Sequence, residues 1–184
     1  GAQIALAAYV RLFADPKTTD KAFGAAQVGR MADMIFQKWP GQEEADDAAL
    51  TLVNFAVSQG DFEKSAEYLK KISANSPRRG LAELRAGQAL WSAYVRGMQA
   101  PAESRPPQDK LDALKKQSQD LLGQGVARLE KAETIDPAVV GAIFTLAQIL
   151  VDSGQSDKAI AWLEHDKIGP LTLIKQKNPI ASRD

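Results

Sequence analysis

The chain has 184 residues, with 23 Lys and Arg against 23 Asp and Glu, one His and no Cys. This balanced charge argues against a dedicated binder of nucleic acid or of membrane surfaces, since both need a basic excess. The lack of Cys excludes disulfides, thiolate metal sites and thiol catalysis. A single His argues against a Ser-His-Asp triad and against a metal site with several His ligands. The sequence therefore predicts no catalytic residues, no metal ligands and no cofactor.

The composition favours helices. The chain contains 30 Ala and 18 Leu, which lose little entropy in a helix, against 9 Val and 10 Ile. No alternating apolar run is long enough for a strand, and no apolar run has the length of a membrane span or the pattern of a signal peptide. Because the chain starts at Gly1 without Met, we expect it to be a piece of a longer protein.

Prolines divide the chain into intervals of 37, 60 and 33 residues, and each proline follows one amphipathic stretch and precedes another. Proline cannot continue a helix, and it disfavours helical geometry in the residue before it. Gly60 and Gly154 lie near the middle of the first and third intervals, at expected tight turns. The pattern predicts two helix–turn–helix units of about 34 residues with an enlarged unit between them. The prolines are Pro40, Pro77, Pro137 and Pro170.

Residues 41–77 give the clearest unit. A first helix is expected over residues 42–59, Gly60 closes it, and Asp61 is a good N-cap for a second helix. The second helix carries its apolar side chains at helical spacing, at Phe62, Ala66, Leu69 and Ile72.

The motif from Gly60 to Ala66, Gly-Asp-Phe-Glu-Lys-Ser-Ala, followed by Leu69 and Pro77, resembles the tetratricopeptide repeat (TPR). A second copy begins with Leu146-Ala147, continues from Gly154 to Ala159 and ends with Leu163, and a partial third copy comprises Leu129, Ala132 and Asp136-Pro137. The resemblance implies an all-α fold of TPR-like helix–turn–helix repeats in a right-handed α-superhelix, an α–α solenoid. The Trp and Tyr usual in the first helix are absent from both clear copies.

The middle unit, residues 78–137, has two long apolar stripes, over residues 81–98 and 111–132. They predict an antiparallel helical hairpin joined by a proline-rich loop over residues 99–109. Gly123 and Gly125 are expected to weaken the second arm or to let another helix approach closely.

The ends of the chain carry weaker signals. Residues 1–40 are interpreted as a degenerate helical hairpin, broken at Asp15-Pro16. Residues 138–170 form the last TPR-like repeat. Residues 171–184 are interpreted as a loop or as the truncated start of a further repeat.

The resemblance also implies a binding site, because the first helix of each repeat in this family lines a concave groove. The positions that this implies are small or mildly apolar, which suits a helix or an extended apolar peptide. They are Leu50, Asn54 and Val57 in the clear repeat, Arg79, Ala82, Ala86 and Ala89 in the enlarged one, and Phe144, Gln148 and Val151 in the last.

Individual polar residues favour structural roles. His165 is expected at a helix C-terminus, and the acidic residues 43–47 at a helix N-terminus, where each complements the helix dipole. The acidic residues lack the spacing of a calcium loop. Arg78, Arg79 and Arg85 are interpreted as solvated surface charge, with a contact to a partner carboxylate as the alternative.

The sequence as a whole favours a non-catalytic protein–protein interaction or scaffold module that belongs to a larger repeat protein. Its expected partner is a protein or peptide of unknown identity, with no nucleic acid and no membrane insertion. One alternative is a structural spacer or a self-association module that forms homo-oligomers through the long hairpin. The other is a small-ligand or enzymatic helical domain with a pocket among Trp91, Tyr94 and Arg85. A buried, desolvated Arg85 would favour this last alternative.

Overall fold

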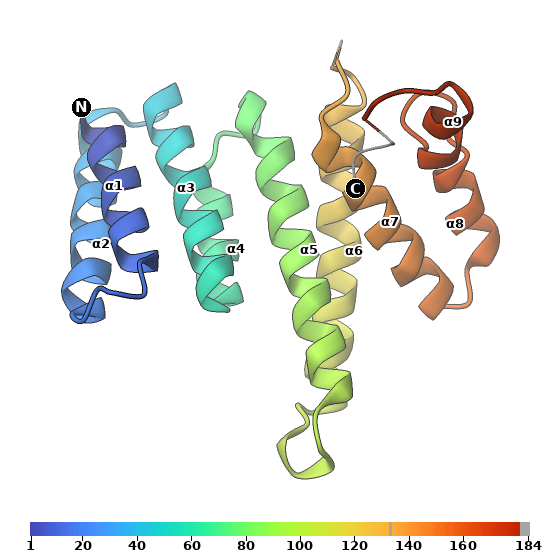
Figure 1. Ribbon diagram of the computed structural model, residues 1–184, viewed down its shortest axis with the longest axis horizontal. Coiled ribbons are helices and arrows are strands. Elements are labelled where there is room, and N and C mark those ends of the chain that lie inside the picture. Colours follow the sequence, from blue (N-terminus) through green and yellow to red (C-terminus); the bar gives the residue numbers. More distant parts are fainter. Residues whose placement is uncertain (133, 181–184) are drawn as a thin grey trace. The chain divides into compact units, whose positions relative to one another are not determined.

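The computed structural model describes residues 1–132 and 134–180. Within this part the protein is all-α, with nine α-helices, one short 3-10 helix and no strand (Figure 1). The predicted all-α class is therefore confirmed. The chain divides into two compact units, residues 1–82 and 83–184, which are described separately.

The first unit consists of two helical hairpins. In each hairpin the two helices pack directly against each other, and the second hairpin also contacts the first. The helices are α1 (Ala2–Ala14), α2 (Lys21–Lys38), α3 (Glu43–Gln59) and α4 (Phe62–Lys71). Their shared core contains the buried side chains of Leu6, Val28, Ala32, Ile35, Ala48 and Leu52.

Local signals set several helix ends in this unit. Gly60 adopts a left-handed conformation with φ of 73° after α3, which a residue without Cβ adopts at no steric cost. The side chain of Asp61 accepts a hydrogen bond from the backbone N–H of Lys64 at 3.1 Å, and Asp20 accepts one from Phe23 at 2.8 Å. The predicted turn at Gly60 and the predicted N-cap at Asp61 are confirmed.

The second unit is built from a long hairpin followed by shorter helices. The first arm, α5, begins within the first unit and continues into the second, and α6 lies behind it in Figure 1 with the connecting loop at the lower end. The elements are α5 (Pro77–Gln99), η1 (Ala102–Ser104), α6 (Gln108–Leu129), α7 (Pro137–Asp152), α8 (Ser156–Leu163) and α9 (Pro170–Lys175). The core of this unit includes the buried Leu84, Leu122, Val126, Ile143, Leu146, Ile149 and Ile168.

The two arms of the hairpin approach closely at Gly87. The hydroxyl of Ser118 on α6 donates to the Gly87 carbonyl at 2.7 Å, and a Cβ at Gly87 would lie 2.8 Å from Cγ of Leu122. A Cβ at Gly123 would meet nothing within 4 Å. The close contact at Gly87 comes from a glycine on the first arm, whereas of the two glycines named on the second arm Gly123 faces open space and Gly125 is buried.

The segment expected as a loop or as the truncated start of a further repeat contains a short helix. Pro170 opens the helix α9, where its fixed φ and missing N–H suit the first helical position. Ile168 and Leu173 are each only 1% exposed. A Cβ at Gly169 would lie 2.4 Å from the backbone nitrogen of His165, so only glycine fits this contact. The buried side chains of Ile168 and Leu173 and the close contact of Gly169 with the His165 backbone hold this segment in place. Such contacts produce no capping motif in the sequence.

Candidate functional site: a groove in the second unit

An open groove of about 930 Å³ runs between α5 and α7 in the second unit. Its lining is mainly apolar, with a few polar side chains, as in typical ligand and peptide sites. The lining residues are Trp91, Ser92, Val95 and Arg96 from α5, Phe144, Ala147, Gln148, Val151 and Asp152 from α7, and Leu163 from α8.

The α7 wall exposes large apolar side chains. Phe144 is 47% exposed and Val151 is 58% exposed, although the opposite face of α7 carries the buried Ile143, Leu146 and Leu150. A helix whose buried face already forms the core has no internal need for apolar residues on its outer face. Contiguous apolar surface of this kind is typical of interaction sites.

Two stacked rings lie within the α5 wall, and one hydrogen bond joins this wall to α7. The rings of Trp91 and Tyr94 stack with their centroids 4.9 Å apart and an angle of 22° between their planes. The indole N–H of Trp91 donates to Oε1 of Gln148 at 3.3 Å. Trp91 is therefore fixed in position as one side of the groove while its ring stays partly exposed.

A charged network closes one end of the groove. Tyr94 donates its hydroxyl to Oδ2 of Asp152 at 3.0 Å, and Nζ of Lys115 on α6 lies 2.6 Å from the same oxygen. The Lys115 hydrogen bond is the main cause that lowers the pKa of Asp152, against the opposing effect of burial. Burial, with the neighbouring Asp152 carboxylate second, raises the pKa of Tyr94. At neutral pH the network is thus a carboxylate between a phenol and an ammonium group, and it joins α5, α6 and α7.

The structure brings the three groove positions expected in the last repeat, Phe144, Gln148 and Val151, into this one groove. Leu50 and Asn54 line a separate hollow of about 280 Å³ in the first unit. Val57 is half-buried and does not line that hollow.

The four positions expected in the enlarged repeat do not form a binding surface. Ala82, Ala86 and Ala89 are 0%, 0% and 6% exposed, so their side chains contact other parts of the protein. Arg79 donates from Nη1 to the carbonyls at the end of α4, those of Leu69 and Ile72, both at 2.8 Å. The three alanines lie on the buried face of α5, which the repeat spacing alone does not reveal.

The acidic residues at the start of α3 do more than complement its dipole. Asp46 is 5% exposed and accepts hydrogen bonds from the backbone N–H of Ser73 at 2.9 Å and from its hydroxyl at 3.1 Å. Asp47 pairs with Nε of Arg78 at 2.5 Å, and Glu43 lies 3.4 Å from the same guanidinium. Sequence reasoning missed these contacts because the partners are 27 to 35 residues apart.

The surroundings of His165 and Arg85 agree with structural roles for these two side chains. His165 lies two residues beyond the end of α8, stacks on Trp162 with centroids 5.8 Å apart, and has Nε2 3.4 Å from a Glu130 carboxylate oxygen. Arg85 is exposed, which weakens the enzymatic alternative. Among residues 1–132 and 134–180, no group of three or more His, Asp or Glu is arranged to hold a metal ion.

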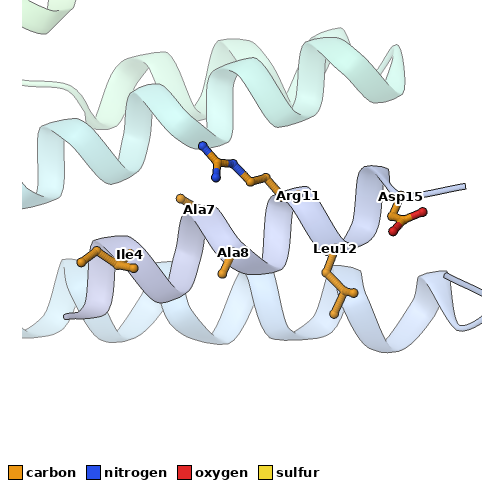
Figure 2. A pocket seen from close by; sticks show the side chains of 6 residues that line it. All are labelled: Ile4, Ala7, Ala8, Arg11, Leu12 and Asp15. Atoms are coloured by element: carbon orange, nitrogen blue, oxygen red, sulfur yellow. The ribbon is translucent and has the colours of Figure 1, made fainter. Parts of the chain in front are cut away.

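A second surface hollow, of about 580 Å³, follows the outer face of α1. Figure 2 shows its side chains along that helix, from Ile4 to Leu12, with Asp15 directly after the helix end. Ile4 is 76% exposed and Leu12 is 46% exposed. Unlike the groove in the second unit, this surface has one helix for a wall.

No known protein family, curated protein or solved structure matches this chain. In the part of the chain that the structure describes, none of the helices combines the length and hydrophobicity needed to cross a membrane. The site is therefore characterised by its own geometry.

Proposed function

We propose that this chain is a non-catalytic protein–protein interaction module, built of TPR-like repeats in a right-handed solenoid, which binds a peptide or helix in the groove between α5 and α7. The carrying observation is that Phe144, Gln148 and Val151, expected from the repeat pattern to face a partner, line one groove together with Trp91. Two of the three are apolar and about half exposed, which gives a partner surface area to bury.

The surroundings of the groove also support binding over chemistry. Its charged carboxylate, Asp152, is engaged by Lys115 and Tyr94, and the pKa of Asp152 is lowered, which is unfavourable for a general base at neutral pH. Apolar walls around a few fixed polar groups are well suited to recognising a protein segment.

Affinity capture with matched variants tests this function. The purified chain is immobilised as wild type, as the double variant Phe144→Ser/Val151→Ser, and as Ile160→Ser. Ile160 is 53% exposed and lies on α8 outside the groove, so it controls for a general loss of surface hydrophobicity. We expect a protein that wild type and Ile160→Ser capture and the double variant does not. Turnover of a small molecule with no groove-dependent protein partner would contradict the proposal.

A further inference from the structure

The length of the groove limits its occupant. Its α7 wall runs from Phe144 to Asp152, and eight residues at about 1.5 Å each give a wall of about 12 Å. This length accommodates about two turns of a helix or about four residues of extended chain.

The hydrogen-bonding groups of the walls favour the helix. Both walls are helices, whose main-chain groups are already bonded within the helix. Of the polar side chains, Ser92 donates its hydroxyl to the Gln88 carbonyl at 3.0 Å, and Oε1 of Gln148 accepts from Trp91. An extended segment would lose hydration of its N–H and C=O groups here without a strand edge to pair with, whereas a helix bonds its own backbone internally.

The charges of the groove lie at one end. Arg96 and Asp152 follow the last apolar positions of the two walls, and the Asp152 carboxylate is already bonded by Lys115 and Tyr94. Arg96 is exposed, and the planar guanidinium suits a carboxylate through its fork of N–H donors. The complementary charge on a partner at this end is therefore negative.

Together these features point to one kind of partner, and the inference rests on the proposed function. The geometry points to a single amphipathic helix as the occupant, with an apolar stripe at positions i, i+3 or i+4, and i+7 between Trp91 and Phe144, and with an Asp or Glu at the Arg96 end.

Parallel selection from two peptide libraries tests this inference. One display library holds 14-residue peptides of helix-forming composition, and the other holds 14-residue peptides in which alternating β-branched residues and proline prevent a helix. Both are selected on the wild-type chain and counter-selected on the double variant Phe144→Ser/Val151→Ser. Winners are synthesised, and their affinities and bound-state circular dichroism are measured, with Ile160→Ser as the off-groove control.

We expect groove-dependent winners from the helical library, with binding weakened about tenfold or more by the double variant and unchanged by Ile160→Ser. We also expect these winners to contain an acidic residue. Replacing that residue by Lys should weaken the binding of the peptide to the wild-type chain. The Lys-substituted peptide should in turn regain binding to the Arg96→Glu variant of the chain. Groove-dependent winners that are extended would overturn the helix while leaving the proposed function intact. Helical winners without the charge exchange would overturn the inferred contact between Arg96 and a carboxylate of the partner. The absence of groove-dependent winners from both libraries would count against the proposed function itself.

Discussion

Several cationic side chains close the C-terminal ends of helices from outside those helices. Each donates to main-chain carbonyls that have no partner within the helix, and a positive charge there also complements the helix dipole. Lys21 does so for α1, Arg79 for α4 and Lys167 for α6; the acceptors are the carbonyls of Phe13 and Asp15, of Leu69 and Ile72, and of Glu130 and Ala132. These residues hold the turns between helices, a role that their charge alone does not reveal.

Arg79→Ala should lower the free energy of unfolding by about 2 kcal/mol, because two carbonyls at the end of α4 lose a charged hydrogen-bond donor. Arg85→Ala, which removes an exposed arginine from the same helix, should change it by less than about 0.5 kcal/mol. Urea unfolding followed by circular dichroism measures both. Equal effects of the two substitutions would assign Arg79 to the surface, as the sequence first suggested.

Asp152 should contribute stability that depends on pH. Because Lys115 and Tyr94 lower its pKa in the folded state below the usual value of 3.8, the unfolded chain takes up this proton more readily as the pH falls. The contribution is therefore present above about pH 4 and is lost as the pH falls through the folded pKa. Wild type should lose more stability than Asp152→Asn between pH 6 and pH 3. Parallel losses in thermal melts of the two proteins would show that the Asp152 contacts are energetically unimportant.

At the scale of elements, local and long-range signals contribute differently. The turn at Gly60 and the cap at Asp61 are local, since φ and a bond three residues away decide them, and both were predictable. The pairing of the two long arms is predicted by their apolar stripes, whereas the close contact at Gly87 and the burial of Leu173 in α9 were not predictable. Both features depend on long-range contacts: that of Gly87 with Leu122, and those that bury the side chain of Leu173.

Gly87 and Gly123 form a matched pair within the long hairpin. Gly87→Ala should destabilise the protein by about 1–3 kcal/mol, because the new methyl group would overlap Leu122. Gly123→Ala should stabilise it by about 0.5–1 kcal/mol, because α6 gains helix propensity and the Cβ meets nothing. Chemical denaturation of the two variants measures the opposite signs. A stabilising effect of Gly87→Ala would contradict the close packing of α5 on α6, in which a Cβ at position 87 would lie 2.8 Å from Cγ of Leu122.

At the scale of the whole molecule, the described residues form one hydrophobic core within residues 1–82 and another within residues 83–180. In the proposed repeat architecture each segment is stabilised mainly by its own packing and its nearest neighbours. Regional differences in stability are then expected, and native-state hydrogen exchange detects them.

Ile143→Ala removes a fully buried side chain from the second core and should cost about 2–5 kcal/mol. The loss of amide protection in hydrogen exchange should be larger in residues 83–180 than in residues 1–82. Ile35→Ala, in the first core, should give the reverse pattern. An equal loss of protection throughout the chain in both variants would show a single cooperative unit.

The sequence by itself determined the helical class, the approximate helix ranges and the turns at Gly60 and Gly154, because spacing, glycine conformation and capping are properties of neighbouring residues. It also indicated Phe144, Gln148 and Val151 as a shared surface. Only the tertiary structure decided that Trp91 and the Lys115–Asp152–Tyr94 network complete that surface, and that Arg79 and the alanines of α5 are not part of it. Those outcomes depend on which residues meet across helices, and a hydrogen bond between positions 57 residues apart, such as that from Trp91 to Gln148, leaves no pattern in a single sequence.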